Sequence, residues 1–86
     1  MSSTDRTDTA SIVIADVQVN PAWVGRRISE LESTSGARVA YVTRLGEGML
    51  PTADTVYQDG DLVHVCTTSE ALTRVEHTLD QPPPVH

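Results

Sequence analysis

The chain has a single cysteine, no lysine, no phenylalanine and an aromatic content of only 3%. One cysteine excludes an intrachain disulfide and is typical of a protein from a reducing compartment. Few aromatic rings leave few platforms on which bases can stack. Six basic residues stand against twelve acidic ones, a net charge of −6, so the clustered cations of a general nucleic-acid binder are missing. We therefore expect neither DNA nor RNA as a partner.

The chain also lacks any apolar run near the ~20 residues that cross a membrane, and no charged start followed by an apolar stretch predicts a secretory signal. At 86 residues it is one small domain or a piece of a larger protein. A domain of this size buries only about 60% of its unfolded surface. Small cores poor in aromatic residues are often stabilised by oligomerisation, so we expect a dimer.

Both ends differ in composition from the middle. Residues 1–10 (MSSTDRTDTA) are polar without an apolar period, which indicates a disordered linker or a remnant of expression. Residues 81–86 (QPPPVH) contain three consecutive prolines, which donate no backbone hydrogen bonds and predict a disordered tail. The domain is therefore expected over residues 11–80.

The first half of this domain predicts a strand, a helix and a second strand. Residues 11–19 alternate with period two, as a strand does. Residues 23–32 carry Val24, Ile28 and Leu31 at helical spacing, and Gly36 is a suitable left-handed stop. Residues 37–45 alternate again and form the second strand, with Val39, Tyr41 and Thr43 on one face.

The second half predicts short strands, a longer strand and a last helix. Gly46-Glu47-Gly48 reverses the chain into a short piece at 49–51, which Pro51 suits to a sheet edge. An extended piece at 55–57, a strand at 62–67 and a helix capped by Ser69 follow, the helix burying Leu72, Val75 and Leu79. The fold class is α+β, a small and mostly antiparallel sheet with two helices. Arg44 is expected to hold an acidic turn at Asp59 or Asp61, and Trp23 to seal the core.

Signatures of catalysis are missing. The sequence has no Cys-x-x-Cys, no His-Glu-x-x-His and no phosphate loop. Cys66 has no flanking basic residue and is expected to be a structural thiol. The three histidines fall in different predicted elements, which favours solvated or hydrogen-bonded rings over a metal site: His64, His77 and His86. We expect no enzyme, no catalytic residue and no metal.

Four stretches, in order, give the sequence from Asp16 to Leu79 a family resemblance. The first is VNPAWVGR at 19–26, and the second is LE followed by ARVAYVTR between 31 and 44. The third is LP followed by DTV between 50 and 56, and the fourth is DGDLVHV at 59–65. Together they resemble the C-terminal regulatory (RCK C-terminal, TrkA_C) domain of TrkA-type potassium-uptake proteins. The resemblance implies a β-α-β-β-β-α domain that forms a symmetric homodimer. The all-arginine composition favours the GC-rich genome of an actinobacterium.

The resemblance also implies a place in the cell. It predicts a cytoplasmic domain that regulates potassium transport at the inner face of the membrane, through a transporter subunit. In the family a Rossmann domain that binds NAD or ATP precedes this one. The chain lacks that domain's fingerprint and length, so it is expected to be an excised C-terminal half or a stand-alone domain with no cofactor of its own.

A ligand is implied as well, because related domains bind the second messenger cyclic di-AMP in the groove between two subunits. The matching positions here are Leu31, Arg38, Val39 and Pro51. A dianion needs an arginine or backbone donors for each phosphate. Ser33 and Ser35 stand where relatives often carry a basic residue, a departure that weighs against phosphate binding. The alternatives are a dimerisation and gating module without a small-molecule ligand, or one that binds a cation at acidic interface residues.

Overall fold

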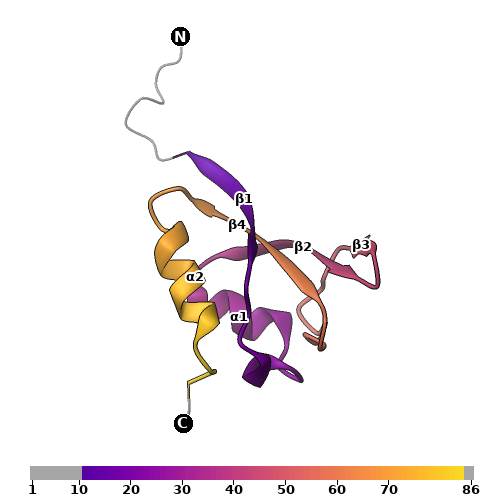
Figure 1. The fold of residues 1–86 in the computed structure, drawn as a ribbon. Helices are drawn as coiled ribbons and strands as arrows, with labels where there is room; N and C mark the ends of the chain where they lie inside the picture. Colours follow the sequence, from indigo (N-terminus) through magenta and orange to yellow (C-terminus); the bar gives the residue numbers. More distant parts are fainter. Residues whose placement is uncertain (1–10, 85–86) are drawn as a thin grey trace.

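A computed structural model describes residues 11–84. The predicted linker at 1–10 and the last two residues of the predicted tail lie outside this range. The elements follow one another as strand, helix, three strands and helix, with a short 3-10 turn before the first helix (Figure 1). Their bounds are β1 Ile12–Val17, η2 Pro21–Trp23, α1 Ile28–Ser35, β2 Arg38–Arg44, β3 Glu47–Met49, β4 Leu62–Thr68 and α2 Leu72–Asp80. The predicted order β-α-β-β-β-α is confirmed.

The four strands form one sheet in the order β1-β4-β2-β3, with every neighbouring pair antiparallel. The last strand in sequence, β4, therefore lies in the middle and pairs with both β1 and β2. At the edge, β3 pairs only with the end of β2, from Val42 to Arg44. Both helices lie on one face of the sheet (Figure 1). The predicted α+β class is confirmed. The edge strand exists, but it is Glu47–Met49 and not 49–51, because the chain already reverses at Leu45 and Gly46, and Pro51 lies outside it.

The core lies between the sheet and the two helices. Valines of the three longer strands meet Ile28 and Leu31 of α1 and Val75 and Leu79 of α2. Trp23 and Tyr57 close its ends and are buried as well. Full burial of one such aliphatic side chain contributes about 1.5–3 kcal/mol, so these few residues supply most of the stabilising free energy.

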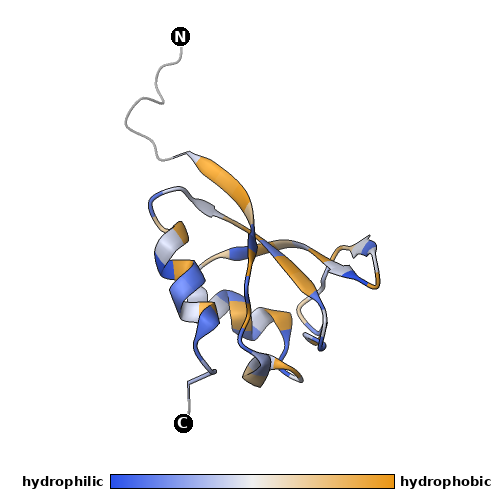
Figure 2. Ribbon diagram, in the orientation of Figure 1, coloured by the Kyte–Doolittle hydropathy of each residue, from blue (hydrophilic) through white to orange (hydrophobic). Residues whose placement is uncertain are grey.

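The opposite face of the sheet carries apolar side chains that the helices do not cover. Ile12 and Ile14 of β1 are 64% and 61% exposed, and Leu62 of β4 is 56% exposed. Figure 2 shows the apolar colour along the outer half of β1. We call this surface the open face; it also holds Tyr41, His64 and Cys66. The alternation predicted for β4, with Val63 and Val65 on the opposite side from His64, is confirmed.

The first helix starts later than its apolar spacing predicts. The chain turns over residues 23–26, where the Arg26 N–H donates to the carbonyl of Trp23 at 2.9 Å, and α1 begins only at Ile28. Gly25 has a φ of 94°, and its N–H donates to the carbonyl of Tyr57 at 2.9 Å. Tyr57 in turn donates to Arg26 at 2.8 Å. This long-range backbone pairing outcompetes the helical stripe, and Val24 is left 42% exposed. The predicted stop at Gly36, with φ 80°, is confirmed.

Two further local predictions are wrong. In β2 a register shift between Val39 and Tyr41 places Val39 and Val42 in the core and Tyr41 on the open face, because a β-bulge interrupts strict alternation. At the other end, α2 begins at Leu72 and not just after Ser69. The hydroxyl of Thr68 accepts the Ala71 N–H at 3.1 Å instead, which fixes a turn before the helix.

The end of α2 is joined to the segment that follows β1. Asn20 donates its backbone N–H to the carbonyl of Leu79 at 2.8 Å and its amide to that of Asp80 at 3.0 Å. The indole N–H of the buried Trp23 donates to the carbonyl of Gln81 at 2.7 Å. Pro83 is buried as well. The described part of the predicted tail, residues 81–84, thus contributes contacts to the domain, and Trp23 seals the core as expected.

Candidate functional site

The turn between α1 and β2 carries two of the predicted ligand residues, and a buried serine fixes its shape. The hydroxyl of Ser35 donates to the carbonyl of Leu31 at 2.7 Å and accepts the Ala37 N–H at 3.2 Å. Gly36 then turns in the left-handed region, where a glycine pays no Cβ penalty. Arg38 follows as the first residue of β2. The position of Arg38 is therefore set by local backbone geometry.

The four residues predicted to bind a ligand differ in exposure. Leu31 has no exposed surface and Val39 is 8% exposed, so both side chains belong to the core. Arg38 is exposed, and Pro51 is half-buried in the loop after β3. The structure brings Leu31 and Val39 together in one cluster, whereas Arg38 pairs with Cys66 at the start of β2 and is therefore on the open face. Their contact with a ligand stays a prediction.

The sequence also allows Arg38 to be a solvent-facing strand residue paired with Glu32 or another acid, but among residues 11–84 Glu32 contacts the backbone of the next residue instead. Its carboxylate oxygen Oε2 accepts a hydrogen bond from the Val39 N–H at 2.9 Å. The Val39 N–H belongs to the part of β2 that precedes its pairing with β3. The Glu32 carboxylate therefore accepts the hydrogen bond that the carbonyl of a neighbouring strand would otherwise accept. A carboxylate thus lies beside the backbone of Arg38 and Val39, and what the sequence did not predict is its hydrogen bond to the Val39 N–H across seven residues.

Arg74 is a residue that the sequence interpretation missed. It is exposed on α2, and its Nη1 lies 3.9 Å from the point where a Cβ on Gly36 would be. Its guanidinium therefore lies beside the α1–β2 turn. Among residues 11–84, neither Arg38 nor Arg74 forms an ion pair with an acidic side chain. No spacing in the sequence links Arg74 to this turn, because only the packing of α2 on α1 brings it there.

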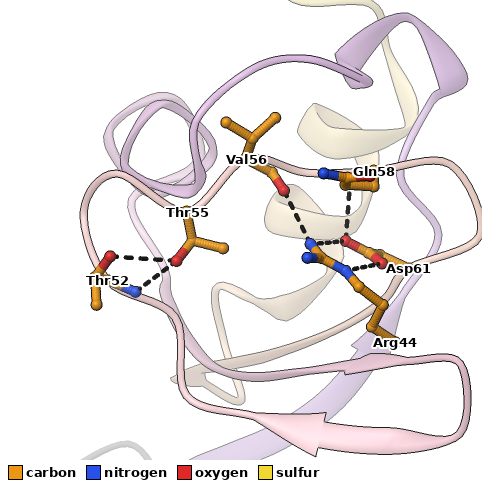
Figure 3. Close-up of polar contacts among 6 residues, drawn as sticks. All are labelled: Arg44, Thr52, Thr55, Val56, Gln58 and Asp61. Carbon is orange, nitrogen blue, oxygen red and sulfur yellow. Dashed lines mark hydrogen bonds and ion pairs between the residues drawn. The ribbon is translucent and has the colours of Figure 1, made fainter.

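A different arginine is fully engaged. Arg44 Nε and Nη2 donate to the two oxygens of Asp61 at 2.9 and 2.7 Å, and Nη2 also donates to the carbonyl of Val56 at 3.0 Å (Figure 3). Asp61 accepts the Gln58 N–H at 3.0 Å as well. The hydrogen bond from Arg44 lowers the pKa of Asp61 below its ordinary value, against the opposing effect of burial. The predicted partner Asp61 is confirmed, and the pair fixes the loop to β2.

The loop held by this pair has its own internal contact. The hydroxyl of Thr55 accepts the Thr52 N–H at 2.8 Å (Figure 3). The carbonyl of Thr55 accepts the Ile28 N–H at 2.7 Å, which joins the loop to the start of α1. The loop after β3, which carries Pro51, is thus joined to the start of α1 through Thr55. It is joined to Arg44 through Val56 and Asp61.

On the open face, His64 connects three strands. Its Nδ1 hydrogen-bonds to Asp16 Oδ1 at 2.6 Å and its Nε2 to Thr43 Oγ1 at 2.9 Å, while the ring stacks on Tyr41 with centroids 4.0 Å apart. Each polar atom of the imidazole therefore has a partner. Within residues 11–84, no three histidine, cysteine, aspartate or glutamate side chains gather to hold a metal ion. The histidine is a structural link between β1, β4 and β2.

A hollow of about 430 Å³ lies between the end of β1 and α2. It is lined by Asp16, Gln18, Thr73, Glu76, His77 and Asp80. With three carboxylates on its wall it does not suit an anionic ligand. Among the described helices, neither is long and apolar enough to cross a membrane.

Comparison with known proteins places this geometry in a family. Residues 12–80 match the TrkA-C domain. The Trk system potassium uptake protein TrkA of Streptomyces coelicolor is 44% identical over 78 residues, which cover 91% of this chain and 35% of that protein. The chain thus spans about a third of the length of this relative.

Solved structures show the same fold at low identity. "Structure of RCK domain with cda" has a TM-score of 0.63 at 18% identity and covers 80% of this chain and 97% of that one. The RCK_C domain dimer of S. agalactiae BusR in complex with c-di-AMP gives 0.63 at 16%, covering 83% and 91%. The GsuK channel bound to NAD gives 0.64 at 19%, covering 80% and 13%. Since the family match runs from the first strand to the last helix, the chain belongs to the TrkA-C domain family.

Proposed function

We propose that the chain is a cytoplasmic regulatory domain of a potassium-transport system, which senses cyclic di-AMP at the interface of a symmetric homodimer. The relative from Streptomyces is a potassium uptake protein, and the BusR domain of the same fold is a dimer in complex with c-di-AMP. A membrane transporter subunit is the partner through which the domain acts. NAD or ATP would belong to a preceding domain and not to this chain.

The observation that carries the ligand proposal is the exposed Arg38 at the rim of the α1–β2 turn. In a chain of net charge −6, an arginine without an acidic partner in the described residues is available to an anion. A guanidinium group recognises a phosphate with two parallel hydrogen bonds. Binding across a dimer would shift its population toward one subunit arrangement, and so change the angle of the attached domains.

The dimer proposal rests on size and on exposed apolar surface. The core is small, and the open face presents Ile12, Ile14 and Leu62 to solvent. Leu45, between β2 and β3, and Leu50, just after β3, are 98% and 82% exposed. A second copy of the chain would bury such surface and extend the core. Large exposed apolar patches on small domains mark interaction sites.

The alternative is a dimerisation and gating module that binds no small molecule, and one observation favours it. The Glu32 carboxylate accepts a hydrogen bond from the Val39 N–H, next to Arg38 in the chain. Its negative charge would repel a phosphate group there. Ser33 is exposed and Ser35 is buried by its own hydrogen bonds, so neither supplies the basic group found in relatives. On this account, sensing belongs to another domain.

Calorimetric titration of the purified domain with cyclic di-AMP distinguishes the messenger-sensing domain from the gating module without a ligand. We expect saturable heat with one ligand per two chains, and no heat with ATP or AMP at the same concentration. Arg38→Ala should weaken binding, whereas Arg26→Ala should not. The Arg26 guanidinium is paired with the Glu30 carboxylate at the other end of α1, with Nη1 3.4 Å from Oε2. The absence of heat and of any thermal shift at high ligand concentration would leave the gating module as the function.

A further inference from the structure

We infer that β1 is the strand through which two copies of the chain pair, so that their sheets join into one continuous sheet across a two-fold axis. The inference rests on the proposed function, because it names a surface on which the proposed homodimer is built. The partner is a second copy of this chain, recognised by backbone hydrogen bonds between two antiparallel strands. We call the side of β1 that faces away from β4 the free edge.

The backbone of β1 is hydrogen-bonded to a neighbouring strand on one side only. In the sheet order β1-β4-β2-β3, β1 pairs with β4 alone. The carbonyl of Ser11 accepts the Ser69 N–H at 2.8 Å, so the backbone groups of Ser11 point toward β4. Since these directions alternate along an antiparallel strand, the N–H and C=O groups of Ile12, Ile14 and Asp16 point to the free edge. No other strand of the described chain pairs with them.

The two edges of the sheet are protected to different degrees. Edge strands that avoid pairing with other chains are short, charged, bulged or contain proline. At one edge, β3 has three residues, begins with Glu47 and is followed closely by Pro51. At the other edge, β1 has six residues in unbroken register with β4, without proline, and its one charged residue is Asp16. The free edge of β1 is therefore the edge that can accept a further strand.

The exposed side chains of β1 favour the same contact. Ile12 and Ile14 are 64% and 61% exposed, and the apolar colour follows this part of the strand in Figure 2. Isoleucine is β-branched, a type of side chain that packs well against a neighbouring strand. Cross-strand pairs of such side chains stabilise a sheet. A partner strand on the free edge would thus cover part of the apolar surface that β1 exposes.

Charge identifies the occupant as a second copy. Two chains of net charge −6 repel each other, so they approach best where the surface is uncharged, and residues 11–15 (SIVIA) carry no charge. A two-fold axis at Ile14 gives every outward-pointing residue a partner, because Asp16 of each copy then lies opposite Ile12 of the other. The two Asp16 residues are four positions apart along the strands, about 13 Å. This separation exceeds the Debye length of about 8 Å at physiological salt.

The size of the contact fits a regulated interface. A standard stable interface buries about 800 Å² on each partner, which is more than one strand edge provides. The pairing is therefore weak in the isolated domain. It becomes stronger where attached domains hold two copies close together, because their effective concentration is then high.

The test compares two variants of Ile14 by sedimentation equilibrium. Ile14→Ala shortens the side chain and keeps the backbone N–H, whereas Ile14→Pro also removes the N–H that points to the free edge. Proline is tolerated on an edge strand at such a position and favours an extended residue before it, so β1 stays paired with β4. We expect Ile14→Pro to weaken association about ten-fold or more beyond Ile14→Ala, because both copies lose a donor. Equal association of the two variants would overturn the inference.

Ala15→Pro is the matched control for the direction of the backbone. The N–H of Ala15 points toward β4, so this variant should lower the thermal midpoint sharply at every concentration. In dilute solution, Ile14→Pro should keep a midpoint near that of Ile14→Ala. Equal losses in the two proline variants would show that the backbone directions are wrong, and would overturn the inference.

Amide hydrogen exchange of the wild type gives a readout that needs no variant. The N–H groups of Ile12, Ile14 and Asp16 should exchange rapidly in dilute solution and slowly at concentrations where sedimentation shows a dimer. Rapid exchange in the dimer would overturn the pairing of β1 and leave the homodimer standing on another surface. Slow exchange in the monomer would also overturn it, because these groups would then have partners within the chain. Monomer mass at all concentrations would overturn the homodimer and this inference with it.

Discussion

At the scale of single residues, the Arg44–Asp61 pair joins β2 to the turn before β4 through two hydrogen bonds. Asp61 is buried, and three hydrogen bonds reach its carboxylate. Asp61→Asn removes the charge that Arg44 binds, and we expect it to lower the free energy of unfolding by about 2 kcal/mol. Urea unfolding followed by the fluorescence of Trp23, the single tryptophan, measures the change. Asp59→Asn is the matched control, because Asp59 is exposed in the same turn.

The same pair predicts how stability depends on pH. The pKa of Asp61 is lowered in the folded state by its hydrogen bonds from Arg44, whereas an unfolded aspartate titrates at about 3.9. The stabilisation is therefore complete above about pH 4 and is lost as the pH falls below that value, toward the folded-state pKa. Wild type should lose more stability than Asp61→Asn between neutral pH and pH 3. Parallel losses in the two proteins would contradict this assignment.

Single residues also show what the sequence could predict of the candidate site. Asp61 was one of two acids, with Asp59, expected to pair with Arg44, since both belong to the acidic turn before the strand at 62–67. The burial of Leu31 follows from helical spacing, yet its place among ligand residues came only from family resemblance. Arg74 carried no signal, because its position beside the α1–β2 turn depends on tertiary packing. Glu32 was considered only as an ion-pair partner of Arg38, and its hydrogen bond to the Val39 N–H was not predicted.

At the scale of elements, the start of α1 shows how backbone pairing outweighs periodicity. The apolar spacing of Val24, Ile28 and Leu31 is helical, but Gly25 is free to take a φ of 94° and to pair with Tyr57. A single sequence does not reveal that residues 55–57 lie next to residues 25–27. The same limit applies to β2, where the bulge after Val39 changes which side chains are buried. Element types and order were predictable, but boundaries and register depended on distant partners.

Gly25 gives a prediction at this scale. A Cβ at Gly25 would have no neighbour within 4 Å, so Gly25→Ala changes backbone strain and not packing. We expect a loss of about 1–2 kcal/mol in the free energy of unfolding, the ordinary cost of a left-handed conformation for a residue with a side chain. Gly48→Ala on β3 is the control, since its Cβ would make only ordinary contact with Tyr41 and its φ is not positive. Chemical denaturation of the two variants should separate them clearly, and equal losses would argue against the strain.

At the scale of the whole molecule, the sheet has one covered and one open face. The fold and its family were predictable, because strand alternation, turn residues and four motifs in order agree with one another. That Ile12 and Ile14 would stay exposed in the single chain was not, because apolar residues on the open face follow the same period-two pattern as residues in a two-sided core. Ile14 and Val17 are both β-branched residues of one strand, yet they are 61% and 7% exposed.

A dimer predicts that thermal stability depends on protein concentration. Since association stabilises the folded state by mass action, the midpoint of unfolding should rise as the chain concentration is raised from micromolar to millimolar. Ile14→Ser on the open face should reduce this dependence, because it removes exposed apolar surface without disturbing the core. Sedimentation equilibrium at the same concentrations gives the mass directly. A midpoint independent of concentration, with monomer mass throughout, would exclude the homodimer.

The link between Trp23 and Gln81 has a consequence for where the folded unit ends. The family match stops at residue 80, but the carbonyl that accepts the hydrogen bond from the Trp23 indole N–H belongs to Gln81. A chain cut after Asp80 would leave that N–H buried without an acceptor, at a cost of about 1–3 kcal/mol. The prolines that follow are then not a dispensable appendage, since the buried Pro83 lies beyond the cut. Any truncation of this domain, natural or engineered, is expected to tolerate loss after residue 84 better than loss before it.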